Sequence, residues 1–381
     1  MTALLRLFFT LIGALIGVGL GFALAFLLSL IFGFIFIPAI LNFCKDRQLY
    51  DIPNQRKVHK TLTPRLGGVS FIPGMALSVL IVTSLMNVES SHTKVQISLW
   101  SIAFLISVIL IYAVGIIDDF IGLNAKIKFF VQCITAITLP ACGLYINNLY
   151  GFLGIHEIPY VIGAPITVFV IVFIDNSINL IDGIDGLSAS LSAIALTGFL
   201  YCFANEGLRI YCLFIAALIG VLIPYLYFNI WGKTEKNRKI FMGDSGSLTL
   251  GFILGFLFIK LSMNTPLLTT PADERFLFAY SLLIVPVFDT VRVIIHRIRT
   301  RRPLFQADKN HIHHKLMKAG LSQHITLIII LGIDIFFILF NLLLSRHMGI
   351  NGVVLIDIVT FTVFQIVLTL FINKKSIKPT E

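Results

Sequence analysis

The stretch Asn176-Ser-Ile-Asn-Leu-Ile-Asp-Gly-Ile-Asp-Gly-Leu187 decides how the rest of the chain is interpreted. It carries two amides and two carboxylates, Asn176, Asn179, Asp182 and Asp185. Apolar runs over 168–174 and 187–200 flank it, and polar groups at the edge of hydrocarbon are costly and usually functional. Its two glycines break a helix and let the backbone approach a ligand. The alternative is a turn in which Asp and Asn cap two membrane helices. One cap would suffice for that, and we expect Asn176 to be the residue that only caps a helix.

Composition places the chain among membrane proteins. Of its 381 residues, 57% are hydrophobic and 13% are charged, whereas ordinary soluble domains carry about 25% charged residues. The five cysteines are an odd number and show no C-x-x-C spacing, so neither a disulfide framework nor a zinc site is indicated. We therefore expect an all-α polytopic membrane protein that forms one integral-membrane domain over residues 1–381, with no separate soluble domain.

The apolar runs predict the number of membrane crossings, because a transmembrane helix needs about 20 apolar residues. We expect eleven spans, over approximately 11–41, 67–87, 97–117, 128–147, 160–178, 187–204, 209–230, 247–263, 275–296, 324–345 and 351–373. The first apolar run continues through Ile40, so we expect an uncleaved first span and not a signal peptide. An odd number of spans puts the two termini on opposite sides of the membrane.

The distribution of positive charge predicts the orientation. Together with Lys128 and Arg292 at their margins, five connecting segments hold 23 of the 29 Lys and Arg residues: 42–66, 118–127, 231–246, 297–323 and 374–381. The positive-inside rule makes these segments cytoplasmic, with the N-terminus outside and the C-terminus in the cytoplasm. The net charge of +10 is therefore mainly a topology signal. Attraction of anionic ligands or lipid headgroups is compatible with it.

The polar motifs fall on this predicted cytoplasmic side. They are Asp118-Asp119, Asn176 to Asp185, Gly243-Asp-Ser-Gly-Ser247 and His311-Ile-His-His314. The predicted external loops carry no comparable cluster, which indicates an active site at the cytoplasmic interface. An anion transporter is the alternative from another class. A transporter would be expected to have ionisable groups near the membrane midplane and two halves related by an internal repeat. The sequence shows no such repeat.

The acidic motifs favour a metal–phosphate site. Adjacent carboxylates such as Asp118 and Asp119 repel each other, so a cation is expected nearby. Mg²⁺, Lys126 or Lys128 can supply it. The Gly-Asp-Ser-Gly-Ser motif opens an apolar helix, where backbone N–H groups can face an anion and Asp244 can hold a metal on it. The alternatives are solvated loop acids for the first pair and a plain helix cap for Asp244.

The cationic segment that follows the ninth predicted span favours phosphate binding. It contains Arg302 and then three histidines, His311, His313 and His314. These histidines lack the i, i+4 spacing of a helical zinc pair, and Arg and His side chains suit phosphate better. A solvated basic loop next to the membrane is the alternative. Asp289, near the cytoplasmic end of that span, is predicted to pair with Arg292 one turn on, with structural and functional roles equally open.

Together these residues resemble the polyprenyl-phosphate N-acetylhexosamine-1-phosphate transferases, the family of WecA, TagO and MraY. The resemblance covers nearly the whole chain. In the family's order, it includes Asp51-x-Pro-Asn-x-Arg-Lys-x-His59, Pro64-Arg-Leu-Gly-Gly68, Asp118-Asp119, Asn176 to Leu187, Gly243 to Ser247 and His311 to His314. The His-Ile-His-His form and the loop from Asp51 are similar to the WecA/TagO branch, whereas MraY-like enzymes carry an uninterrupted His run.

The resemblance implies a reaction in which a UDP-N-acetylhexosamine and undecaprenyl phosphate give the lipid-linked diphospho-sugar and UMP. It implies Mg²⁺ as the cofactor, with Mn²⁺ as a substitute. It also implies the bacterial plasma (inner) membrane, an active site on the cytoplasmic face, contact with the lipid bilayer and no nucleic-acid partner. A homodimer stays open. GlcNAc is the default sugar of this branch, and the sequence does not separate it from GalNAc, FucNAc or QuiNAc, nor does it identify the envelope polymer. An MraY-like enzyme that uses UDP-MurNAc-pentapeptide is the closest alternative.

The resemblance also implies roles for individual residues. Asp244 and Asn179 would share the metal, and Asp118 and Asp119 would be the catalytic pair that orients or deprotonates the lipid phosphate. Substrate contacts would come from Asp182, Asp185, Lys128, His311, His313, His314 and Arg302. Because a phosphate monoester has a second pKa of about 6, the acceptor is largely dianionic at neutral pH, which favours its direct attack on the donor. A covalent phospho-aspartate on one of the catalytic pair is the alternative.

Overall fold

The computed structural model describes the backbone of residues 2–51, 62–89, 99–266, 268–303 and 309–377, and the side chains of these residues from 19 to 374. Most of the motif from Asp51 to His59 lies outside the described residues. The described chain is helical apart from one short antiparallel hairpin formed by β1 (Asn148–Phe152) and β2 (Ile155–Glu157). The prediction of an all-α polytopic membrane protein is confirmed.

Thirteen α-helices follow one another along the described chain. They are α1 (Thr2–Asp46), α2 (Phe71–Glu89), α3 (Leu99–Ile121), α4 (Ala125–Ala141), α5 (Tyr160–Ile181), α6 (Leu187–Asn205), α7 (Arg209–Leu226), α8 (Asp244–Ser262), α9 (Ala272–Ser281), α10 (Ile284–Arg299), α11 (Ile312–Lys318), α12 (Gln323–Leu344) and α13 (Ile350–Ile377). Short 3-10 turns, Gly67–Ser70 and Thr234–Lys236, precede α2 and α8, and α7 continues into a π-helical turn, Tyr227–Trp231.

The number of membrane crossings differs from the expected eleven. Nine helices of the described residues are long and apolar enough to cross a bilayer, and α9 with α10 makes a tenth candidate that is bent by 65°. The predicted span 128–147 corresponds to α4, which has 17 residues and ends at Ala141. At 1.5 Å per residue it reaches about 26 Å, less than the hydrocarbon thickness of about 30 Å. The count of eleven is therefore not confirmed.

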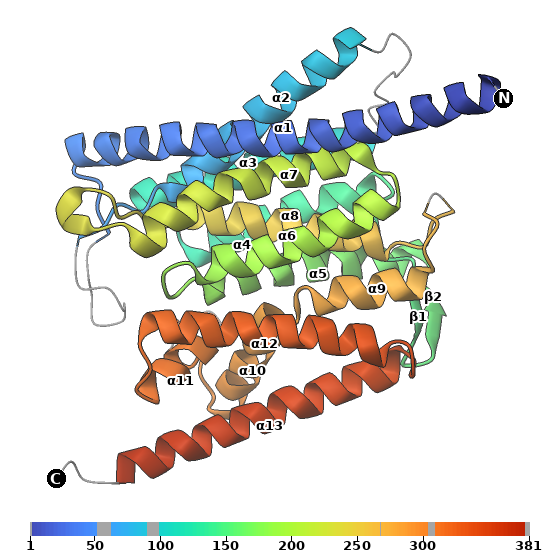
Figure 1. Ribbon diagram of the computed structural model, residues 1–381. Helices are drawn as coiled ribbons and strands as arrows, with labels where there is room; N and C mark the ends of the chain where they lie inside the picture. The colour runs from blue at the N-terminus through green and yellow to red at the C-terminus, as the bar shows by residue number, and fades with distance from the viewer. Residues whose placement is uncertain (1, 52–61, 90–98, 267, 304–308, 378–381) are drawn as a thin grey trace.

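The helices run along a common direction, so the molecule has two ends. In Figure 1, α1 begins at the right and α13 finishes at the left, so the two termini lie at opposite ends of the bundle. The figure places α11 at the left end and the β1–β2 hairpin at the right end. We call these the α11 end and the hairpin end.

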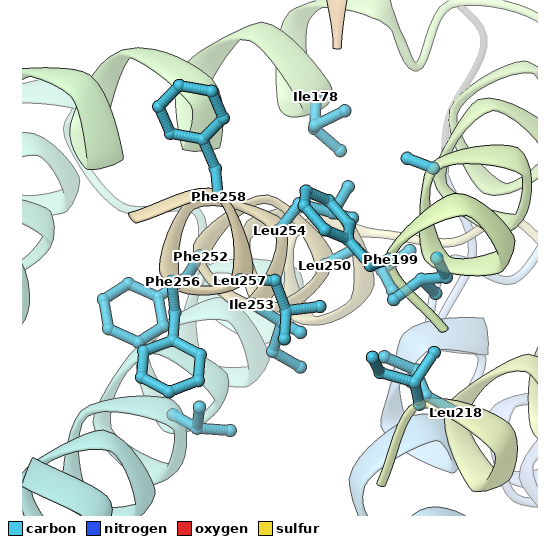
Figure 2. Packing of buried hydrophobic residues seen from close by; sticks show 14 of the residues in the cluster. Ile178, Phe199, Leu218, Leu250, Phe252, Ile253, Leu254, Phe256, Leu257 and Phe258 are labelled. Atoms are coloured by element: carbon cyan, nitrogen blue, oxygen red, sulfur yellow. The ribbon is translucent and has the colours of Figure 1, made fainter. Parts of the chain in front are cut away.

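Helix α8 forms the centre of the larger part of the bundle. It packs against α3, α5, α6 and α9, and every residue of its apolar stretch is buried. Figure 2 shows Phe252, Phe256 and Phe258 projecting from this helix among the side chains of its neighbours. A helix that is apolar on all sides is stable only when it is surrounded, so the sequence of α8 itself requires the central position.

The start of α8 is also a point of close backbone contact. The backbone N–H of Gly68 donates to the carbonyl of Met242 over 2.8 Å, and a Cβ at Gly68 would overlap the backbone of Gly246. A Cβ at Gly115 in α3 would lie 2.5 Å from Cα of Ser245. These glycines allow α3 and the turn before α2 to touch the first turn of α8.

The remaining helices form a second layer. A separate cluster of buried apolar side chains joins α10, α11, α12 and α13 to the start of α6, and it includes Leu187, Ile284, Ile312, Ile330 and Phe361. Figure 1 shows these orange and red helices below the main bundle. At the hairpin end, Asn351 exchanges hydrogen bonds with the backbone of Gly151 and Leu153, each 2.8 Å long. The second layer is thus attached to the first at both ends.

The contact at Gly68 leads to a test of the packing. We expect Gly68→Ala to lower the unfolding temperature in detergent, because the neighbouring backbone of α8 cannot move aside and overpacking costs roughly 1–3 kcal/mol. Gly332→Ala in α12 is the matched control, because nothing lies within 4 Å of the added Cβ. It should be neutral or stabilise by up to about 1 kcal/mol. Equal unfolding temperatures for the two variants would contradict the close contact.

Candidate active site

The site begins where the C-terminus of α3 meets the N-terminus of α8. Asp119 accepts the backbone N–H of Asp244 on Oδ1 (2.8 Å) and that of Ser245 on Oδ2 (3.0 Å). These N–H groups are among those that a helix leaves unpaired in its first turn, where the helix dipole also favours a negative charge. Gly243 reaches this turn with φ of +72°, and a Cβ there would collide with the carboxylate of Asp119. A glycine at position 243 is therefore a steric requirement.

Arg65 secures the other side of this junction. Its guanidinium donates to the backbone carbonyl of Asp119 from Nε (2.9 Å) and Nη2 (2.7 Å), and to that of Asp118 from Nη2 (3.1 Å). A cation on the last carbonyls of a helix is stabilising. Arg65 was not predicted as a site residue, although the Pro-Arg-Leu-Gly-Gly motif that contains it was noted.

Three carboxylates gather at this junction. Each of Asp118, Asp119 and Asp244 has a carboxylate oxygen within 4.8 Å of one oxygen of each of the other two. Among the described residues, this is the only group of three or more potential metal ligands at that distance. Lys128 lies between two of them, with Nζ 2.7 Å from Asp244 and 3.4 Å from Asp118. Like charges so close need a cation, and the ammonium of Lys128 supplies it.

Asn179 joins this group from α5. Its Nδ2 donates to Oδ1 of Asp244 (3.2 Å) and to Oγ of Ser247 (2.8 Å). Asn176 does not cap a helix, so that prediction is wrong. It lies inside α5 and its Nδ2 donates to Gln132 of α4 (3.0 Å). Gln132 in turn donates to the buried Asp175 (2.9 Å), so Asn176 links two helices.

Two residues that were not predicted hold the loop between α5 and α6. Lys239 Nζ lies 2.6 Å from Oδ2 of Asp185 and also donates to the backbone carbonyl of Asn229. The side chain of Asn229 accepts the backbone N–H of Gly186 (2.6 Å) and donates to the carbonyl of Ile240 (2.7 Å). The only sequence signal for Lys239 is its place four residues before Gly243.

Asp182 lies in the same loop as Asp185, but its electrostatic surroundings differ. Burial, followed by the negative charges of Asp244 and Asp185, raises its pKa to about 7. Its neighbour Asp185 has the ammonium of Lys239 beside it. Near neutral pH, the carboxyl of Asp182 is therefore partly protonated.

The histidine segment is held by Asp289. Oδ2 of Asp289 lies 2.8 Å from Nδ1 of His311, and Oδ1 accepts the backbone N–H of Ile312 (3.0 Å). Nη2 of Arg292 lies 2.8 Å from Oδ1 of Asp289, which confirms the predicted pair. Arg292 also donates to the backbone carbonyl of Asn310. Asp289 thus fixes the start of α11.

His313 connects this segment to the acidic loop. Its side chain is fully buried, and a Cβ at Gly183 would overlap its ring. Burial, followed by the neighbouring His314 and His311, lowers the pKa of His313 to about 3. At neutral pH the ring is therefore uncharged and can offer one N–H donor. Arg302, by contrast, has an exposed side chain beyond the end of α10, and it makes no contact with the carboxylates within the described residues.

Fold and site together define a membrane-embedded protein with an acidic, cation-requiring centre at one end of its helix bundle. The sequence model of glycosyl transferase family 4 matches residues 101–262, which include most of this centre. The chain is 34% identical over 298 residues to a probable undecaprenyl-phosphate N-acetylglucosaminyl 1-phosphate transferase of Bacillus subtilis (strain 168), covering 75% of each chain.

Two further relatives have comparable similarity. The undecaprenyl-phosphate alpha-N-acetylglucosaminyl 1-phosphate transferase of Yersinia pestis is 30% identical, with 74% of this chain and 73% of the relative covered. The decaprenyl-phosphate N-acetylglucosaminephosphotransferase of Mycolicibacterium smegmatis (strain ATCC 700084 / mc(2)155) is 31% identical, with 73% and 71% covered. The chain therefore belongs to the polyprenyl-phosphate N-acetylhexosamine-1-phosphate transferase family, in its WecA/TagO branch. These names do not favour the MraY-like or transporter alternatives.

The pairing of Lys239 with Asp185 can be measured through stability. We expect Lys239→Met to destabilise the protein by about 1–2 kcal/mol, because it leaves a half-buried carboxylate without its cation. Adding Asp185→Asn should recover part of the loss, and the double-mutant cycle gives the coupling energy. Lys236→Met is the control, because Lys236 is exposed in the same connection. A coupling energy of zero would show that the loop is held in another way.

The uncharged state of His313 predicts a pH dependence of stability. Its pKa in the folded protein lies below the ordinary value of 6.5, so the unfolded chain binds the proton more readily. The contribution of uncharged His313 to the free energy of unfolding is then fully present above about pH 6.5 and is lost as the pH falls. Between pH 7.5 and 5.5, wild type should lose about 1 kcal/mol more than His313→Gln, which does not titrate. Parallel pH profiles of unfolding temperature for the two proteins would contradict the assignment.

Proposed function

We propose that this protein transfers an N-acetylhexosamine-1-phosphate group, most simply that of GlcNAc, from a UDP-sugar to undecaprenyl phosphate and releases UMP. The observation that carries this proposal is the group formed by Asp118, Asp119, Asp244 and Lys128. It lies where α3 ends and α8 begins, and we expect a lipid phosphate and a water-soluble nucleotide to meet there. The names of the relatives support the same acceptor and sugar.

The acidic group fits a divalent cation. Carboxylate and amide oxygens are the ligands that Mg²⁺ takes from proteins, usually one or two carboxylates together with substrate phosphates. Asp244 and Asn179 would hold the ion, with Asp118 within reach. When bound, Mg²⁺ or Mn²⁺ supplies positive charge to the donor diphosphate. The ammonium of Lys128 now balances the same carboxylates, so it would be free to turn toward a substrate phosphate once the cation is present.

The proposed reaction is a direct phosphoryl transfer. An oxygen of the lipid phosphate forms a bond to the β-phosphorus of the UDP-sugar, and the bond from that phosphorus to the oxygen bridging the two phosphates breaks. UMP leaves with the bridging oxygen. The acceptor phosphate is largely dianionic at neutral pH, so positioning and charge neutralisation contribute more than proton removal.

The hydrogen bonds of Asp118 and Asp119 support different roles for the two carboxylates. Both oxygens of Asp119 already accept backbone N–H groups of α8, which supports a positioning role at the helix junction. Asp118 points to Lys128 and to the N–H of Leu123 (2.6 Å), and it is the better candidate to meet the acceptor phosphate. The two-step alternative would likewise use Asp118 for the phospho-aspartate.

The donor would lie beside the acidic loop and the start of α11, which touch where the ring of His313 meets Gly183. The loop contributes Asp182 and the half-buried Asp185, and the α11 segment contributes His311 and His313. The neutral ring of His313 suits a hydrogen bond to a phosphate or sugar oxygen, and Asp289 fixes the ring of His311. We place the α11 end on the cytoplasmic side of a bacterial plasma membrane, because the connections at this end carry most of the Lys and Arg residues.

Purified protein in detergent tests the proposal directly. Given UDP-GlcNAc, undecaprenyl phosphate and Mg²⁺, it should release UMP, and a panel of UDP-N-acetylhexosamines would identify the sugar. No release with any of them would refute the proposal. Exchange of labelled UMP into the donor in the absence of acceptor would support the two-step route. Its absence from an active preparation would support direct transfer.

The metal assignment has its own test. We expect Asp244→Asn to lower turnover by about 100-fold and to raise the Mg²⁺ concentration needed for half-maximal activity, because one carboxylate ligand is lost. Asp273→Asn is the matched control, since Asp273 is exposed in α9 near the hairpin end. Wild-type activity and metal dependence in Asp244→Asn would show that Asp244 is not a ligand.

A further inference from the structure

A second site lies at the hairpin end, opposite the carboxylates. It is a pocket of about 600 Å³ between the last turns of α6, the start of α9 and the last turns of α12. Its lining residues include Glu206, Arg275, Asn341 and Arg346. Figure 1 shows the ends of these three helices on the side of the β1–β2 hairpin, away from α11. The transfer reaction makes no use of this pocket.

The pocket has the shape of a site for an amphiphile. From Ile338 to Arg346 its wall covers nine residues, of which those up to Leu344 belong to α12 and give about 9 Å of helix. The rim is charged, whereas Leu277, Phe278 and Leu342 line the wall. Leu342 is 42% exposed, and it lies on a helix that is long and apolar enough to span a membrane. A crevice in contact with a bilayer is filled by lipid or water, and this one offers both a polar rim and an apolar wall.

The charges of the pocket cancel. It is lined by two acids and two arginines, Glu206, Glu274, Arg275 and Arg346. A strongly anionic lipid would need a net positive charge here, and a cationic ligand would need a net negative one. A balanced pair of charges is instead complementary to a headgroup that carries one charge of each sign.

Two of the four charges are fixed by the protein itself. Partial burial raises the pKa of Glu206, but hydrogen bonds from Thr270 and Thr269 outweigh this effect and hold the pKa below its usual value. The carboxylate accepts the backbone N–H groups of both threonines. Arg275 is 3% exposed and donates to the carbonyl of Thr270 (3.1 Å). The charges of these two side chains are therefore already engaged by groups of the protein.

The other two charges, Glu274 and Arg346, have exposed side chains at the rim. A carboxylate is best satisfied by N–H donors and a guanidinium by phosphate oxygens. We propose that the pocket binds a zwitterionic phospholipid with a primary ammonium headgroup, such as phosphatidylethanolamine. Glu274 accepts from the ammonium, Arg346 donates to the phosphate, and the start of an acyl chain lies along Leu277, Phe278 and Leu342.

Delipidated full-length protein in detergent tests this proposal. Native mass spectrometry would count bound lipid, and the unfolding temperature would be followed as phosphatidylethanolamine, phosphatidylcholine or phosphatidylglycerol with identical acyl chains is added. Phosphatidylcholine has the same net charge without N–H donors, and phosphatidylglycerol has a negative charge. We expect phosphatidylethanolamine to bind at least about five-fold more tightly than either of the others, which corresponds to about 1 kcal/mol.

Variants at the rim complete the test. Glu274→Gln and Arg346→Ala should each weaken phosphatidylethanolamine binding by about five-fold, the loss of one exposed charged contact. Arg209→Ala is the control, because Arg209 is an exposed arginine at the same end outside the pocket. Equal binding of all three lipids, preference for phosphatidylglycerol, or unchanged binding in both rim variants would overturn the proposal. UMP release does not enter these measurements, so the result is independent of the proposed function.

Discussion

The structure depends on one carboxylate placed at a helix terminus. Asp119 ends α3 and at the same time accepts the first free N–H groups of α8. This contact fixes the most buried helix of the molecule at its start, with Gly243 and Gly115 providing the room for the backbones to meet. Arg65 closes the junction from the other side by donating to the carbonyls of α3. The apolar stretch of α8 does little to define the axial position of the helix, and the polar contact at its start does so.

The same contact explains why the site is where it is. The N-terminus of α8 attracts anions, so it stabilises the carboxylate of Asp119. Asp244, one residue into the helix, adds a further negative charge that needs Lys128 or a metal to balance it. Without a cation these carboxylates would repel one another, and Lys128 supplies the balancing charge. Under the proposed function, a bound metal ion would take over this role of Lys128.

Much of this arrangement could be predicted from the sequence, and the reasons for the rest are physical. Hydrophobic runs and the one-sided motifs predicted an all-α membrane protein, and Asp118, Asp244 and Lys128 do come together. The pair of Asp289 with Arg292 followed from helical spacing. Contacts between distant segments carry no such local signal, so Lys239 and Asn229, which hold the acidic loop, were not predicted. Asn176 was misassigned because a polar residue near a helix end was taken as a cap, whereas it faces α4 from inside α5. The length of α4 was overestimated, because apolar residues continue beyond the helix end at Ala141.

The contact of His313 with Gly183 has a mechanical consequence. No space separates the imidazole from the backbone of the acidic loop, so α11 cannot move toward that loop, and a shift of one displaces the other. Lys315 in the same short helix donates to Gln365 and Thr369 of α13, each over 3.0 Å. A displacement of the acidic loop would thus be transmitted through α11 to α13. Under the proposed function, a water-soluble donor and a lipid acceptor would reach the site from different phases, and this linkage would couple their binding.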